Sequence, residues 1–411
     1  MKKILNSENI LVALDIGTTK ICVIVAQKHP DNKIELITIN SVPSMGMSKG
    51  VVIDIAKAVE SIKLAIKEAE NACGFKIKTV AVGISGSHIQ SINSTGTTSI
   101  KKDRVTNQDI INILNSAKSN LDIDGQQILH ILPQFFTIDS EHKVLDPIGM
   151  FGVRLEAKVH IIIGSLSSVQ NIIKCCELSG LAVSDIVLEQ LASAYSAISE
   201  DEKLLGAAIL DIGGGTSDFA IYQNKAVKYT KVFPVASNSI TNDIALCLRA
   251  TLKDAERIKC QYGSAISYEN ANKEYNKIEL AQGNILKNIS ILELNSIIEP
   301  RIKELFLMLK KEIDTYSLRH LMPAGLILTG GGALLKNIEE CAKQILDMPI
   351  RIGAPNILDN QEILNNPAYS TAYGLLLHIL KENKKRTTRN LSSPFINRIL
   401  GQMKSWISDF F

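Results

Sequence analysis

Two aspartate-glycine segments of the chain carry residues suited to binding phosphate and a divalent cation. Residues 14–20 read Leu-Asp-Ile-Gly-Thr-Thr-Lys, and residues 210–216 read Leu-Asp-Ile-Gly-Gly-Gly-Thr. Glycines allow the backbone to approach a ligand and to direct several N–H groups at one anion. An aspartate at the end of the preceding strand could hold Mg²⁺, which proteins bind through one or two carboxylates together with phosphate oxygens and water. We therefore expect both segments to face a phosphate-bearing ligand.

A third glycine-rich segment follows a later strand. Residues 328–333 read Leu-Thr-Gly-Gly-Gly-Ala, which predicts a strand, a tight turn and then a helix. Bare glycines and a helix N-terminus could accept a flat base, a ribose or an α-phosphate. A single Asp-x-Gly turn is common in loops, but two repeated turns followed by Thr-Gly-Gly-Gly are far more specific. The chain contains neither Gly-x-x-x-x-Gly-Lys-[Ser/Thr] nor Gly-x-Gly-x-x-Gly after the first strand.

The two repeated turns supply the first set of candidate ligand-binding residues. Lys20 could meet a phosphate as a point charge, and the threonine hydroxyl groups add donors. The set comprises Asp15, Gly17, Thr18, Thr19 and Lys20 in the first segment and Asp211, Gly213, Gly214, Gly215 and Thr216 in the second.

Apolar runs place these turns between strands. Residues 10–16 and 21–26 flank the first turn, and the stretch 204–233, which reads as three strands, contains the second. The two aspartates lie 196 residues apart, about half the chain, which indicates two related α/β halves that face each other across a cleft.

The remaining pattern alternates strands with helices. Residues 85–163 change character, and we expect them to form a small inserted domain. The other predicted elements are strands at 34–42, 79–84, 127–138, 155–163 and 325–329, helices at 53–72, 107–120, 334–346 and 367–380, alternating elements over 166–198, and a mostly helical stretch over 237–316.

Composition excludes several classes of protein. The 411 residues carry a net charge of +3, too little for a strongly basic nucleic-acid-binding protein. A hydrophobic content of 45% is too low for a polytopic membrane protein. The seven cysteines contain no Cys-x-x-Cys, which favours buried thiols in a reducing cytosol over disulfides or a zinc site. The histidines within 85–163 (His88, His130, His142 and His160) lack metal-ligand spacing and are predicted to be structural or exposed.

The C-terminal region is basic and aromatic. From residue 381 to the end there are seven basic and two acidic residues, so this tail carries +5 and the rest of the chain −2. Residues 381–394 are polar and predict a flexible linker. Apolar residues then recur at i, i+3, i+4 and i+7, which predicts an amphipathic helix suited to lie in the headgroup layer of an anionic membrane. Its apolar stripe comprises Phe395, Ile396, Ile399, Leu400, Met403, Trp406, Ile407, Phe410 and Phe411. The alternative is a final helix packed on the body.

The ordered turns resemble the two phosphate motifs and the adenosine motif of the actin-like ATPase superfamily. Within that superfamily the chain resembles the FtsA family of bacterial cell-division proteins. Further segments that carry the resemblance are residues 83–89, 153–160, 188–196 and 254–263. The resemblance covers essentially the whole chain and implies an α/β fold. That fold is the duplicated two-domain actin-like (ribonuclease-H-like) ATPase fold, with an inserted small α+β subdomain and a C-terminal amphipathic helix.

The resemblance also implies ligands and residue roles. ATP and Mg²⁺ would bind, with Asp15 and Asp211 holding the Mg²⁺ largely through water. Contacts to ribose, adenine and base would come from Glu256, Lys259, Gly331, Gly332 and Leu335. Glu189 matches the position that orients the attacking water, although Gln190 stands where many relatives have proline. The alternatives are a surface or helix N-terminal carboxylate for Glu189, and an exposed i,i+3 ion pair for Glu256 with Lys259.

The same resemblance predicts the domain layout. The nucleotide-binding body would consist of subdomain IA (1–84 and 164–203), the inserted subdomain IC (85–163), subdomain IIA (204–232 and 317–380) and subdomain IIB (233–316). A flexible basic linker (381–394) and a membrane-targeting helix (395–411) would follow.

The implied function is that of a peripheral protein on the cytoplasmic face of the cell (inner) membrane at the division site. It would polymerise head to tail, bind the C-terminal peptide of FtsZ on subdomain IIB and so tether the Z ring, and recruit later division proteins through subdomain IC. Hydrolysis of ATP would be slow at most, and no nucleic acid is expected as a partner. The alternatives are a sugar kinase or exopolyphosphatase of the same fold, and a pilus-assembly actin homologue.

Overall fold

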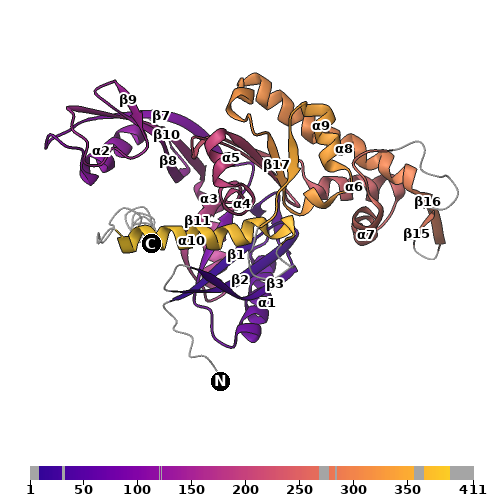
Figure 1. The fold of residues 1–411 in the computed structure, drawn as a ribbon. Coiled ribbons are helices and arrows are strands. Elements are labelled where there is room, and N and C mark those ends of the chain that lie inside the picture. The colour runs from indigo at the N-terminus through magenta and orange to yellow at the C-terminus, as the bar shows by residue number, and fades with distance from the viewer. Residues whose placement is uncertain are drawn as a thin grey trace.

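The computed structural model describes residues 9–29, 33–119, 121, 123–267, 277–282, 285–355 and 365–388. Three bodies of secondary structure can be followed along the chain in Figure 1: two halves, each built on a sheet, and an inserted subdomain. None of the described helices is long and apolar enough to cross a membrane. The predicted helix over residues 395–411 lies outside the described residues.

The first half is built on a five-stranded sheet in the order β11-β6-β1-β2-β3. β1 pairs antiparallel with β2 and parallel with β6. The strands of this sheet are β1 (Ile10–Ile16), β2 (Lys20–Lys28), β3 (Ile34–Pro43), β6 (Thr79–Ile84) and β11 (Ala182–Leu188). The helices that accompany the sheet are α1 (Ile55–Cys73), α3 (Leu166–Leu178), α4 (Glu189–Ala197) and α5 (Glu200–Leu205). A separate short pair of strands consists of β4 (Met47–Ser48) and β5 (Val51–Val52). The predicted helix ending at Gly74 is confirmed, since Gly74 has φ 81° and its N–H donates to the Glu70 carbonyl.

The second half repeats this sheet. Its strand order is β14-β13-β12-β17-β18, so β12 takes the place of β1 between an antiparallel neighbour, β13, and a parallel one, β17. The strands are β12 (Ala207–Ile212), β13 (Ser217–Gln223), β14 (Ala226–Phe233), β17 (Leu326–Thr329) and β18 (Ile350–Ile352). The duplication predicted from the repeated turns is therefore confirmed.

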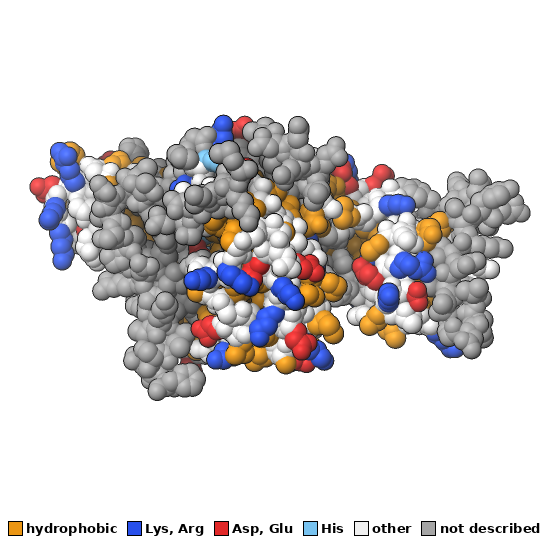
Figure 2. All heavy atoms as spheres, turned by 90° about the horizontal axis from the view of Figure 1, so that it is seen from below, with side chains coloured by type: hydrophobic (Ala, Val, Ile, Leu, Met, Phe, Trp, Pro, Cys, Tyr) orange, Lys and Arg blue, Asp and Glu red, His pale blue; other side chains and the backbone are white. Residues whose placement is uncertain are grey.

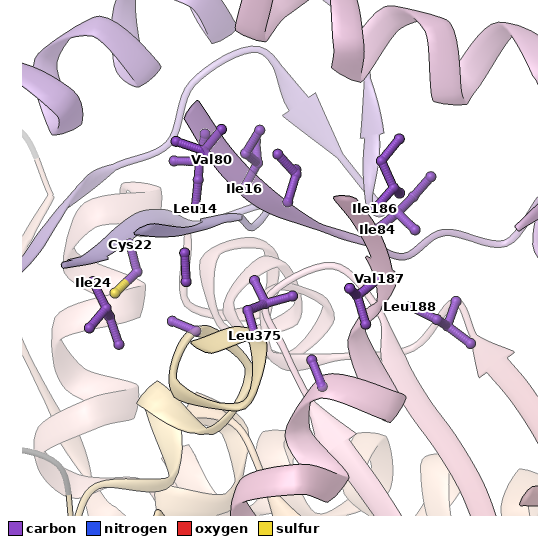
Figure 3. Packing of buried hydrophobic residues seen from close by; sticks show 14 of the residues in the cluster. Leu14, Ile16, Cys22, Ile24, Val80, Ile84, Ile186, Val187, Leu188 and Leu375 are labelled. Atoms are coloured by element: carbon purple, nitrogen blue, oxygen red, sulfur yellow. The ribbon is translucent and has the colours of Figure 1, made fainter. Parts of the chain in front are cut away.

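Each sheet is buried because apolar side chains cover both of its faces. In the first half, Leu14, Cys22 and Ile24 lie in one packed cluster, with Leu375 of α10 (Ser370–Thr388) against them (Figure 3). Helix α10 approaches α4 so closely that a Cβ atom on Gly374 would lie 1.8 Å from the carbonyl oxygen of Ala192. The second half has a core of its own.

The inserted subdomain has a separate core and a four-stranded sheet in the order β7-β10-β8-β9. The elements are β7 (Gln90–Ser99), α2 (Asn107–Lys118), β8 (Gln126–Ile138), β9 (His142–Val144) and β10 (Arg154–Ser165). The predicted helix and the two predicted strands are confirmed, whereas β7 and β9 were not predicted. β7 is rich in Ser, Thr and Asn, and its backbone is ordered by pairing with β10.

The inserted subdomain also contacts the second half. His160 of β10 is buried, with its Nδ1 2.8 Å from Asn93 Oδ1 and its Nε2 2.9 Å from the hydroxyl oxygen of Thr230 on β14. Gln134 of β8 donates to the carbonyl oxygen of Val227, also on β14. The prediction of a structural role for His160 is confirmed.

The helical part of the second half contains α6 (Ser237–Leu248), α7 (Leu252–Tyr262) and α8 (Ile291–Thr315), followed by η2 (Leu318–Leu321). A hairpin of β15 (Lys277–Gln282) and β16 (Ile285–Ser290) interrupts the mostly helical stretch that was predicted there. Alternation in Ile-Glu-Leu could have indicated the first of these strands, whereas Ile-Leu-Lys-Asn-Ile-Ser in the second does not alternate.

Three boundaries predicted near the C-terminus were wrong. The glycine turn after β17 continues as a single 3₁₀ turn, η3 (Gly331–Leu334), and α9 (Ile338–Leu346) begins only at residue 338. Another 3₁₀ turn, η5 (Pro367–Tyr369), precedes α10, which runs on to Thr388. The helix thus extends through residues 381–388, where a flexible linker was expected.

All seven cysteines are free thiols, and four of them are buried. The expectation of buried thiols was wrong for Cys247 and Cys260, which are exposed on α6 and α7.

Candidate functional site

The two repeated turns have the same local structure. The N–H of Gly17 donates to the carbonyl of Lys20 at 3.0 Å, and the N–H of Gly213 donates to the carbonyl of Thr216 at 2.9 Å. Each turn joins two antiparallel strands of its half, β1 with β2 and β12 with β13.

The turns of the two halves lie directly against each other. A Cβ atom on Gly214 would lie 2.4 Å from the Thr19 side chain, and a Cβ atom on Gly215 would lie 2.4 Å from the hydroxyl oxygen of Thr18. The absence of side chains at these two glycines therefore permits contact between the halves. The predicted phosphate cradle is made from both turns together.

Several amides of these turns are available to a ligand. Within the described residues, the N–H groups of Thr18, Thr19, Gly214 and Gly215 donate no hydrogen bond. Helix α6 holds the second turn in place, because its first N–H groups donate to the carbonyl oxygens of Gly213 and Gly214 at 3.1 and 2.8 Å. N–H groups without an acceptor that lie in two contacting turns are suited to an anion.

Next to the turns lie four carboxylates that are close enough to perturb one another: Asp15, Asp211, Asp218 and Glu189. Asp211 and Asp218 are direct partners across β12 and β13. The three aspartates are each 6% exposed or less, which is rare for acidic side chains without a cation.

Burial and mutual repulsion make these groups hard to ionise together. Burial raises the pKa of Asp15 to about 6, an effect that Lys20 opposes and Asp211 increases. Burial also raises the pKa of Asp218 to about 7, against the hydrogen bond that it accepts from Ser85. The pKa of Asp211 is raised by burial, and that of Glu189 is raised well above its usual range by burial and by the neighbouring aspartates. A bound cation would relieve this repulsion.

Asp218 and the hydroxyl groups of Ser85 and Thr371 were not predicted as part of the site, whereas Thr216 was. Asp218 accepts hydrogen bonds from Ser85 at 2.5 Å and from Thr216 at 2.9 Å. Thr371 of α10 donates to Asp211 at 2.7 Å. The signal for Asp218 was present, because an acidic residue opens the otherwise apolar run of β13.

Glu189 is the first residue of α4 and is half-buried. Its side chain packs against Gly83 of β6, since a Cβ atom on this glycine would lie 3.2 Å from Cγ of the glutamate. Glu189 is thus a helix N-terminal carboxylate, and it also lies beside the aspartate cluster.

Lys20 lies near the same carboxylates. Its Nζ donates to the carbonyl oxygen of Ala368 and lies 4.7 Å from the centre of the Tyr369 ring. The lysine therefore joins the first turn to η5, and its charge offsets part of the negative cluster.

Glu256 and Lys259 of α7 form an ion pair of 2.7 Å. The pair is not simply exposed, since the Lys259 side chain is only 8% exposed and also donates to the Thr241 hydroxyl at 2.9 Å and to the Ser237 carbonyl at 3.3 Å. Thr241 in turn donates to Glu256. These contacts fix α7 against α6.

The third glycine segment lies beside the aspartates and helices α6 and α7. Gly330, with φ 83°, touches the Asp211 carboxylate: a Cβ atom there would lie 2.2 Å from Asp211 Oδ1. Gly332 lies against Ser237 in the same way, while a Cβ atom on Gly331 would lie 4.0 Å from the Cβ of Ala368. Leu335 packs near Gly263 at the end of α7. The structure thus places the Gly-rich segment next to Asp211, next to Ser237 of α6 and next to the end of α7.

The residues fit Mg²⁺ only in part. No group of three or more His, Cys, Asp or Glu side chains in the described part of the chain could hold a metal ion alone. Asp15 and Asp211 supply the carboxylate oxygens that Mg²⁺ prefers, and phosphate oxygens and water would have to complete its shell. This donor set fits Mg²⁺ that arrives with a nucleotide.

Comparisons with known proteins agree with this geometry. Residues 208–374 match the family described as "Cell division protein FtsA", and residues 86–163 match "SHS2 domain inserted in FTSA". The chain is 38% identical to cell division protein FtsA of Pseudomonas aeruginosa, over 98% of this chain and 99% of that one. It is 36% identical to that of Escherichia coli strain K12, over 97% and 96%.

Solved structures with low sequence identity share the fold. A PilM–PilN type IV pilus biogenesis complex contains a chain that matches with a TM-score of 0.65 and 15% identity, over 90% of this chain and 98% of that one. MreB5 of Spiroplasma citri bound to ADP matches with a TM-score of 0.57 and 16% identity, over 94% and 100%. The chain therefore has an actin-like fold and belongs to the FtsA family of cell division proteins.

Proposed function

We propose that this protein binds ATP with Mg²⁺ at the junction of its two halves and acts in division as a membrane-attached tether for FtsZ. One observation carries the nucleotide site: two turns with free N–H groups face each other beside four carboxylates that repel one another. The MreB5 structure with ADP, which shares the fold, is consistent with this choice of ligand.

In this proposal each group of residues has a separate task. The free N–H groups of Thr18, Thr19, Gly214 and Gly215 donate to phosphate oxygens, and Asp15 and Asp211 accept hydrogen bonds from water around Mg²⁺. Bound Mg²⁺ supplies the positive charge that allows carboxylates and phosphates to approach. The Glu256–Lys259 ion pair of α7 and the Gly331–Leu335 segment would receive ribose and base.

Hydrolysis would be slow at most. Glu189 could orient a water molecule only while it is ionised, and without a cation its pKa is raised by burial and by the neighbouring aspartates. Nucleotide binding would mainly hold the two halves in one arrangement, which favours a polymer.

Titration calorimetry of ATP in the presence of Mg²⁺ tests the nucleotide site. We expect binding by the wild type and at least a tenfold weaker affinity for Asp211→Asn, because a charge-assisted contact is lost. Asp201→Asn, which removes an exposed carboxylate from α5, is the matched control. Wild-type protein that binds no ATP would refute the proposal.

The membrane part of the proposal rests on the sequence of residues 395–411, with Trp406 in the apolar stripe and basic residues around it. The described side chains seen in Figure 2 show basic, acidic and apolar groups side by side. We infer from the +5 charge of residues 381–411 that the tail carries the attraction to an anionic surface at the cytoplasmic face of the inner membrane.

Exposed apolar side chains support the proposed binding sites for FtsZ, for a second copy of the chain and for later division proteins. Leu246 and Leu252 of α6 and α7 are 77% and 60% exposed, and Arg249 between them in the chain is also exposed, which suits a peptide with apolar and acidic side chains; we assign this surface to the C-terminal peptide of FtsZ. Phe151 and Val153 of the inserted subdomain are 66% and 75% exposed, which suits head-to-tail contacts with a second copy or docking of later division proteins.

Co-sedimentation with anionic liposomes tests the tether. We expect full-length protein to pellet and to recruit purified FtsZ, and the chain ending at residue 394 to remain in the supernatant. If the shortened chain still pellets, or if FtsZ is not recruited by the full chain, the tether is wrong. Vigorous turnover of sugars or polyphosphate in a parallel assay would favour an enzyme instead.

A further inference from the structure

The inserted subdomain touches the first half at the edge of its sheet. β11 is an edge strand in the order β11-β6-β1-β2-β3, and an edge strand leaves N–H groups without strand partners. Leu188, the last residue of β11, donates its N–H to Nε2 of His130 at 3.0 Å. His130 belongs to β8, so a side chain of the inserted subdomain satisfies this backbone group.

The direction of this hydrogen bond defines the form of the histidine. A backbone N–H can only donate, so Nε2 of His130 must be unprotonated. Burial lowers the pKa of His130 to about 4, an effect that His378 increases and Asp185 opposes. His130 therefore remains an acceptor at neutral pH.

The amide that His130 holds lies one residue before Glu189. Leu188 is the N-cap of α4, and it makes no side-chain cap hydrogen bond. The chain turns from strand to helix at this residue, with φ −61° and ψ 131°. The orientation of the Leu188 amide therefore determines how the Glu189 side chain is placed against Gly83 and beside the aspartates.

The other side of α4 is held firmly. α10 packs against it at Gly374 and Ala192, and His378 of α10 pairs with Asp185 of β11 at 3.1 Å. The Tyr195 ring of α4 lies 5.6 Å from the His378 ring. With its body held by α10, the N-terminal end of α4 is the part that the inserted subdomain can influence.

We propose that His130 is a positioning residue through which the inserted subdomain sets the place of Glu189 at the nucleotide site. A partner that shifts this subdomain would move the amide of Leu188 and hence the glutamate. Because coupling between two sites is reciprocal, nucleotide binding would also alter β8. The inference rests on the proposed nucleotide site, and it adds a route between that site and the surface of the inserted subdomain.

Three substitutions separate this role from general packing. His130→Phe keeps a ring but removes the acceptor, His130→Leu is a second variant without an acceptor, and His130→Gln keeps an acceptor near the position of Nε2. Ser184→Ala is the control, since it removes a hydrogen bond from the same strand to Val80 without touching the inserted subdomain. Thermal unfolding and circular dichroism of the full chain identify variants that remain folded.

Hydrogen–deuterium exchange without nucleotide tests the contact. We expect the Leu188 amide to exchange about tenfold faster in the Phe and Leu variants, because the acceptor at His130 Nε2 is lost, and near the wild-type rate in the Gln and Ser184→Ala variants. An unchanged rate in folded Phe or Leu variants would overturn the contact.

The same measurement with a non-hydrolysable ATP analogue and Mg²⁺ tests the coupling. We expect the analogue to change exchange over residues 126–132 in the wild type, the Gln variant and the control, and to leave it unchanged in the Phe and Leu variants. A change that persists in those two variants, or its absence from wild type that binds the analogue, overturns the inference. Wild type that does not bind the analogue refutes the proposed nucleotide site instead.

Discussion

Replacing Asp218 by asparagine should reveal the charge repulsion in the site as a pH-dependent gain in stability. The side chain is 2% exposed, and burial together with Asp211 holds its pKa at about 7 against an ordinary value of 3.8. A carboxylate with a raised pKa stabilises the folded protein only while it is protonated, and the contribution is lost as the pH rises toward 7. Asparagine has the same shape and cannot ionise.

The magnitude follows from this pKa. A change from 3.8 to about 7 corresponds to about 4 kcal/mol at about 1.4 kcal/mol per pH unit, and roughly half of it develops between pH 5.5 and 8.0. We therefore expect the free energy of unfolding of the variant, relative to wild type, to rise by about 2 kcal/mol over that interval. The aspartates titrate together, so this figure is an upper bound.

The assay is urea denaturation at pH 5.5 and 8.0 in EDTA without nucleotide. Subtracting the wild-type value removes the contributions of other groups, including His130 and His160, whose pKa values are lowered to about 4 by burial. Asp201→Asn is the control, and its difference from wild type should be the same at both pH values. An equally constant difference for Asp218→Asn would refute the reasoning about repulsion.

Three further predictions concern other parts of the protein. Lys259→Met removes the buried cation that pairs with Glu256, so we expect the free energy of unfolding to fall by about 1–3 kcal/mol and ATP to bind more weakly, as urea denaturation and calorimetry would show. Gly214→Ala places a methyl group 2.4 Å from the facing turn; it should separate the turns and weaken ATP binding at least tenfold, and wild-type affinity would contradict the contact. A thiol reagent should modify exposed Cys247 and Cys260 rapidly and the buried cysteines only after denaturation, which mass spectrometry of labelled peptides can check.

Local sequence patterns were sufficient for most elements of the two halves. Alternating and continuous apolar runs placed β1, β6 and the three strands over 204–233, and Gly74 correctly ended α1. The repeated turns indicated the duplication, because the chain returns to the same strand-turn-strand pattern. These features depend on neighbours in sequence, so the sequence alone reports them.

Elements that depend on distant partners were not predictable in the same way. β7 is polar and becomes a strand because β10 pairs with it. The third glycine segment forms a 3₁₀ turn in contact with Asp211, which a local pattern cannot distinguish from the start of a helix.

The residues that could bind phosphate and a cation, and the family of the chain, can be recognised without a structure. How these residues meet depends on the packing of distant segments: Gly214 lies against Thr19, Asp218 beside Asp211, and His130 accepts from the amide of Leu188 next to Glu189. Those contacts join residues far apart in the chain, and they exist because the two sheets and the inserted subdomain pack together. Burial in that junction raises the pKa values of the carboxylates, and no sequence motif contains that information.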